Sequence, residues 1–184
     1  MLQLSRRYQI PFALVLVLLM LVTRGHHDFT LAHLPDASWA VFLLAGFYLR
    51  PRWFFVAFLL LAACLDYIAI TWGGVSSFCV TGAYFLLIPA YGALWFAGRS
   101  YIGKGNPVWR DLIPIALHAL AGTLVCELIS SGGFYFFSGR FLEPTLGEFG
   151  VRLTAYLPGN LRAVGFYLGL AAVVHGLYSL LRDR

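Results

Sequence analysis

Long apolar runs alternate with short polar connections along this chain, and this pattern most restricts what the chain can fold into. The runs cover residues 10–22, 38–49, 53–70, 82–97, 112–129 and 161–181. Each transmembrane helix needs about 20 apolar residues. With 60% hydrophobic and 11% charged residues, the chain holds more apolar material than one soluble core can hide. The sequence therefore predicts an all-α integral membrane protein with one domain, residues 1–184, of six transmembrane helices.

The distribution of basic residues supports the short run at 38–49 as a span. With six spans, the side that holds both termini has Arg6, Arg7, Arg50, Arg52, Arg99, Lys104, Arg110, Arg182 and Arg184. The other side has only Arg24, Arg140, Arg152 and Arg162. The positive-inside rule then places both termini in the cytoplasm. Without the second span every later loop would change sides and the asymmetry would be lost.

Cys79 is the one cysteine outside a predicted span, in the connection at residues 71–84. Cys64 and Cys126 lie inside spans, where a thiol usually packs as a small hydrophobic group. We expect Cys79 in or just before the first turn of the fourth helix, with a serine or threonine as the N-cap. Unpaired amides and the helix dipole would favour a thiolate there. Ordinary packing of the thiol is the alternative.

Three other polar residues are predicted on the outer side with Cys79. Asp66 lies near the outer end of the third run, and an intramembrane carboxylate marks a functional site by default. A structural pair with Arg162, or exposure at the interface, would also explain it. Tyr84 could point its hydroxyl into the same pocket or lie at the headgroup level. His27 is a candidate metal or hydrogen-bonding group, or a solvated loop histidine.

The residues at 130–158 are predicted to form a long aromatic connection that could contain a short surface helix. Its Phe134–Phe137 cluster with Arg140, with Gly132 and Gly133 as hinges, could form a lid over a flat ligand. An interfacial aromatic belt is the alternative. Glu127, just before this connection, is expected to hydrogen-bond a ligand or to cap local backbone.

Two histidines favour a different function. His118 and His175 are each about six residues from the cytoplasmic end of their helix, so they lie at a matched depth of about 9 Å. Such a pair could ligate haem in a small membrane redox subunit. A mutual hydrogen bond is the structural alternative, and a membrane subunit with no ligand is a third interpretation of the chain.

The predicted architecture resembles the substrate-binding S component of energy-coupling-factor (ECF) vitamin transporters. Within that class, Asp66, Cys79 in SSFCVTGAY, Tyr84 and the pair His26-His27 resemble the BtuM family of solitary cobalamin (corrinoid) transporters. The six-helix likeness covers nearly the whole chain, and the constellation around Cys79 is shorter but more specific. The resemblance implies that Cys79 is the axial ligand to cobalt, with Asp66, Tyr84 and His27 around the corrin.

The chemistry of a thiolate agrees with this resemblance. A soft sulfur ligand suits a corrin metal and could displace cyanide or the dimethylbenzimidazole base. The family association implies removal of the cyano ligand from cyanocobalamin. Outward polar groups that could bind the corrin amides are Ser77, Thr81, Asn160 and Arg140. The predicted function is corrinoid uptake across the bacterial inner membrane from the periplasmic side.

The expected partners are the corrinoid and membrane lipids, and the basic residues at span ends indicate topology and not nucleic-acid binding. No G-x-x-x-x-G-K-[ST] motif occurs, so no ATP site is predicted. The first helix reads FALVLVLLMLV where docking S components often show Ala-x-x-x-Ala. This favours a solitary protein, with docking of a shared ECF module through Gly165 and Gly169 as the alternative.

The predicted topology can be tested by thiol labelling. A maleimide that cannot cross the bilayer should label Cys79 when added from the periplasmic side of the membrane. Labelling of Cys79 only from the cytoplasmic side would contradict the topology.

Overall fold

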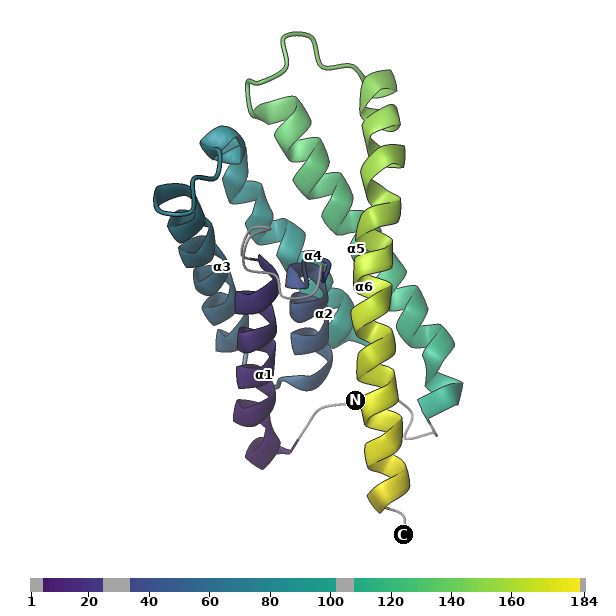
Figure 1. Ribbon diagram of the computed structural model, residues 1–184. Helices are drawn as coiled ribbons and strands as arrows, with labels where there is room; N and C mark the ends of the chain where they lie inside the picture. The colour runs from purple at the N-terminus through teal and green to yellow at the C-terminus, as the bar shows by residue number, and fades with distance from the viewer. Residues whose placement is uncertain (1–4, 25–33, 102–107, 183–184) are drawn as a thin grey trace.

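A computed structural model describes residues 5–24, 34–101 and 108–182, with the side chains of residues 108–111 and 178–182 outside the description. The α-helices in this part of the chain are α1 (Arg6–Arg24), α2 (Ser38–Tyr48), α3 (Trp53–Thr71), α4 (Leu87–Ser100), α5 (Val108–Phe137) and α6 (Leu146–Arg182). Two short 3-10 helices, η1 (Ser77–Cys79) and η2 (Gly82–Leu86), lie between α3 and α4. In Figure 1 the start of α1 and the end of α6 lie at one end, and the α3–α4 and α5–α6 connections lie at the other.

The described helices are those of a multi-pass membrane protein. Four of them are long and apolar enough to cross a bilayer: α1, α3, residues 112–137 of α5 and residues 146–177 of α6. Their outward faces carry exposed large apolar side chains, such as Leu14, Leu60 and Val173. Helices suit this setting because each satisfies its own backbone hydrogen bonds without water.

Helix α2 is the centre of the bundle although it has only 11 residues. It contacts α1, α3, α4 and α6, and all its residues except Trp39 are buried. The apolar run at 38–49 thus forms a helix that its neighbours enclose, and its 11 residues are fewer than the about 20 that a span needs.

Two glycines let α2 and α4 approach each other closely. A Cβ on Gly46 would overlap the Trp95 carbonyl oxygen, and a Cβ on Gly98 would overlap the Leu43 carbonyl oxygen. The ring of Phe42 on α2 stacks on Tyr91 of α4, with 4.4 Å between centroids. These backbone contacts hold α4 against the buried helix.

The predicted long connection at 130–158 is wrong. Helix α5 continues to Phe137 and α6 begins at Leu146, so the connection spans only residues 138–145. Gly132 and Gly133 do not act as hinges, because a side chain on them would press on Phe149 and Leu86. The two glycines thus lie inside a helix, where the lack of a side chain leaves room for Phe149 and Leu86 to pack against α5. Pro158, which was expected to lie between spans, is inside α6.

The predicted fourth helix at 82–97 is also displaced. Residues 82–86 form η2, and α4 runs from Leu87 to Ser100. Pro89 therefore lies in the first turn of α4 and does not kink its interior. Proline is tolerated there because the first-turn amides have no partner within the helix.

The α2–α4 contact predicts a sharp difference between two glycine substitutions. Gly98→Ala should lower stability by about 1–3 kcal/mol, because the backbone of α2 must move to admit the methyl group. Gly169→Ala is the matched control, since its Cβ would meet no atom within 4 Å. Thermal unfolding in detergent should give a lower midpoint for Gly98→Ala alone. Equal midpoints for Gly98→Ala and the unmodified protein would contradict the close approach.

Candidate functional site

Asp66 forms an ion pair with Arg24, the last residue of α1. The guanidinium binds both carboxylate oxygens, with Nε–Oδ1 and Nη2–Oδ2 distances of 2.8 Å. The Arg24 side chain is only 10% exposed and that of Asp66 is 27% exposed. The bidentate geometry is the strong form of such a pair. The alternative partner considered for Asp66, Arg162, instead donates to the Pro158 carbonyl of its own helix.

Arg24 also donates to two other helices. Its Nη1 lies 2.8 Å from the Ser38 hydroxyl on α2 and 3.0 Å from the Tyr91 hydroxyl on α4. Ser38 in turn donates to Asp36, which also accepts the Ser38 amide. One buried arginine thus joins α1, α2, α3 and α4 at the end of the bundle that holds the α3–α4 connection.

Tyr84 reaches the same carboxylate, so its hydroxyl points inward, which was one of the two placements considered for it. Its hydroxyl donates to Asp66 Oδ2 at 2.7 Å. Tyr84 lies in η2, which Thr81 caps by accepting the Ala83 amide. Asp66 therefore connects the end of α3 to η2, the 3-10 helix that directly precedes α4.

Cys79 lies on the segment between these anchors, which we call the Cys79 loop, residues 72–81. It is exposed, as expected of a group available to a ligand. It does not start a helix, however. It is the last residue of η1, a turn of three residues, and α4 begins only at Leu87. The helix dipole expected at Cys79 is therefore not found, because a turn of three residues has no substantial dipole.

Aromatic side chains join the Cys79 loop to the end of α5 and the α5–α6 connection. The ring of Phe78 meets Phe134 edge-on at 5.7 Å between centroids, and the Arg140 guanidinium lies 4.9 Å from the Phe78 ring. Cation–π contacts of this kind are worth about 0.5–1 kcal/mol at exposed sites. Of the predicted aromatic cluster, Phe134 thus meets the Cys79 loop at Phe78, the neighbour of Cys79 in the chain, together with Arg140.

The remaining predicted binding residues are placed differently. Ser77 is exposed in η1, where its carbonyl accepts the Val80 amide, whereas Ser76 supplies the side-chain cap. Thr81 is partly buried and serves as the η2 cap. His27, with His26, lies outside the described residues. Asn160 is partly buried and donates its side-chain amide to Glu127.

Glu127 is a fully buried carboxylate between α5 and α6. It accepts hydrogen bonds from the Ser131 hydroxyl on its own helix and from the Asn160 amide on α6. Of the two expected roles, ligand binding and backbone capping, the described contacts show neither. Glu127 instead fixes the two long helices to each other.

His118 and His175 contact different tyrosines. The Nδ1 atom of His118 lies 2.8 Å from the Pro114 carbonyl, and its ring meets Tyr101 edge-on. The His175 ring lies 6.1 Å from that of Tyr48. Within the described part of the chain, no group of three or more His, Cys, Asp or Glu residues could hold a metal ion.

Sequence reasoning missed Arg24 and Phe78. A signal for Arg24 was present, because an acid within a predicted helix requires a cation at the same depth. Arg24 ends the first helix on the side that also holds the outer end of the third. Nothing in the spacing indicated that Phe78 would join the Cys79 loop to the α5–α6 connection.

Comparison with known proteins adds no relative: no protein-family model matches the chain, and no curated protein matches it.

The ion pair predicts a stability effect larger than that of an exposed pair. Asp66→Asn should destabilise the protein by about 3 kcal/mol, because it leaves the buried guanidinium without its counter-charge. Thermal unfolding in detergent would measure the loss. Glu148→Gln, which removes an exposed ion pair with Arg152, is the control and should change the midpoint little. An equal effect of both substitutions would contradict the role of Arg24–Asp66.

Proposed function

We propose that this protein takes up corrinoids across the bacterial inner membrane and binds cobalt through the Cys79 sulfur. The observation that carries the proposal is an exposed thiol on a loop held in place at its base and flanked by aromatic and cationic side chains. A soft sulfur ligand suits the cobalt of a corrin. The resemblance of Asp66, Cys79 and Tyr84 to the BtuM pattern points to the same ligand.

The surroundings of Cys79 suit a large flat molecule. Phe78 and Phe134 offer apolar ring surface, and Arg140 offers hydrogen-bond donors for amide oxygens. Ser77 and Thr81 add hydroxyl groups on the same loop. Sites for organic cofactors usually combine such apolar surface with a few polar groups that fix orientation.

Asp66 and Tyr84 act in this proposal as positioning residues. Asp66 is engaged with both Arg24 and Tyr84, so its carboxylate holds the base of the Cys79 loop. A fixed base limits the positions that the thiol can take and reduces the ordering cost of binding. His27 is the remaining member of the proposed set of binding residues. The Cys79 sulfur would displace cyanide from the cobalt of cyanocobalamin, and the cyanide would then be released.

The proposed topology has six spans with both termini in the cytoplasm and the Cys79 loop facing the periplasm. It is supported by the excess of basic residues on the side of the termini. It is also supported by the opposite placement of the Cys79 loop and the start of α1 in Figure 1.

The spectrum of cyanocobalamin tests the ligation. Mixing it with purified protein should shift the corrin absorption bands, because sulfur replaces an axial ligand of cobalt. Cys79→Ala should leave the spectrum of free cyanocobalamin.

A matched control is available in Cys64→Ala, which removes the other exposed thiol, on α3. This variant should shift the bands as the unmodified protein does. Identical spectra with the unmodified protein and with Cys79→Ala would refute cobalt ligation by Cys79. Equilibrium dialysis of the same samples would then show whether the corrinoid binds without that ligand.

A further inference from the structure

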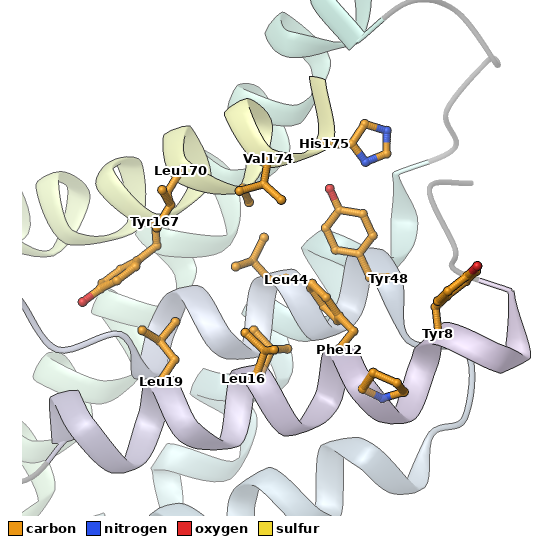
Figure 2. A pocket seen from close by; sticks show the side chains of 13 residues that line it. Tyr8, Phe12, Leu16, Leu19, Leu44, Tyr48, Tyr167, Leu170, Val174 and His175 are labelled. Carbon is orange, nitrogen blue, oxygen red and sulfur yellow. The ribbon is translucent and has the colours of Figure 1, made fainter. Parts of the chain in front are cut away.

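A groove with a cavity of about 450 Å³ lies between α1, α2 and α6, and no residue of the Cys79 loop lines it. Its floor consists of buried Leu16, Leu44 and Tyr48. The residues at its opening are exposed: Val15 on α1 and Val174 on α6 are each 60% exposed. Figure 2 shows the side chains of all three helices pointing into the same space. The groove is therefore open on the side where α1 and α6 would face lipid.

The groove has one polar end and one apolar interior. Tyr8, Tyr48 and His175 lie together at the end nearest the start of α1, and Leu16, Leu19, Leu170 and Tyr167 line the remainder (Figure 2). The Tyr167 hydroxyl is engaged, because it donates to the Pro35 carbonyl at 2.6 Å. This gradient matches that of a lipid, whose polar headgroup lies at the membrane surface and whose acyl chain lies in the core.

The length of the groove matches one leaflet. Its lining on α1 extends from Tyr8 to Leu19, which is about 16 Å at 1.5 Å per residue. Half of a hydrocarbon core of about 30 Å is about 15 Å. An acyl chain from the leaflet on the side of Arg6 would thus lie along the groove without crossing the bilayer centre.

The charge at the polar end selects among lipid headgroups. Arg6 and Arg7 are exposed directly before Tyr8, and the Arg7 guanidinium lies 5.9 Å from the Tyr8 ring. Asp36 and Asp66, two acidic side chains that the structure describes, lie by contrast near Arg24 at the far end of α1. Basic residues beside a groove between transmembrane helices attract anionic headgroups.

We propose that this groove binds an anionic phospholipid, with an acyl chain between α1 and α6 and the phosphate at Arg6 and Arg7. The inference depends on α1 and α6 as membrane spans and not on corrinoid binding. A bound lipid would fill the gap between two helices that otherwise meet mainly through α2. It would thereby stabilise the side of the bundle opposite α3.

Native mass spectrometry of the full-length protein tests this proposal. The protein is released from mixed micelles that contain equal amounts of dioleoyl phosphatidylglycerol and dioleoyl phosphatidylcholine. We expect at least fivefold more retained phosphatidylglycerol than phosphatidylcholine. The double variant Arg6→Gln/Arg7→Gln should bring that ratio to about one. Arg52→Gln/Arg162→Gln, which removes the same net charge elsewhere, should leave the ratio unchanged.

Filling the groove separates a specific site from general lipid contact. Val174→Trp should lower phosphatidylglycerol retention at least fivefold, whereas Leu18→Trp, on an exposed part of α1 outside the groove, should not. Leu170→Trp provides a second filling variant if Val174→Trp unfolds. Equal retention of the two lipids by the unmodified protein, or full retention by the filled variants, would overturn the proposal. A dimer that Val174→Trp abolishes would assign the groove to a second copy and would also overturn it.

Discussion

The ion pair between Arg24 and Asp66 is the constraint on which one end of this bundle depends. A charge within or beside a membrane helix is costly unless a counter-charge and hydrogen bonds compensate it. Arg24 meets this requirement only if α1, α2, α3 and α4 converge on one point. The electrostatic demand of a single guanidinium therefore sets how these helices meet.

The same carboxylate links the buried end of the bundle to the exposed Cys79 loop. Asp66 accepts the Tyr84 hydroxyl, so η2 is held at the end of α3 while Phe78 and Cys79 remain exposed. Phe134 at the end of α5 and Arg140 in the α5–α6 connection contact Phe78 of that loop. The result is a loop with a fixed base and an open surface, and this combination suits capture of a ligand from solution.

Prediction from sequence succeeded best where one apolar run defines one element. The helices α1 and α3 follow from hydropathy. It failed where an element depends on its neighbours. Gly132 and Gly133 resemble hinges in sequence, yet Phe149 and Leu86 occupy the space beside them and the helix continues. Cys79 resembled a helix-start residue because a 3-10 segment cannot be distinguished from a first turn by composition.

The sequence by itself determined that the chain is helical and embedded in a membrane, because apolar runs of this length need lipid around them and internal hydrogen bonds within them. Only the tertiary structure decided that the short α2 is the buried centre and that Arg24, not Arg162, neutralises Asp66. The physical reason is that both outcomes depend on distances between helices. Such distances arise from side-chain packing across elements, which no local pattern along the chain records.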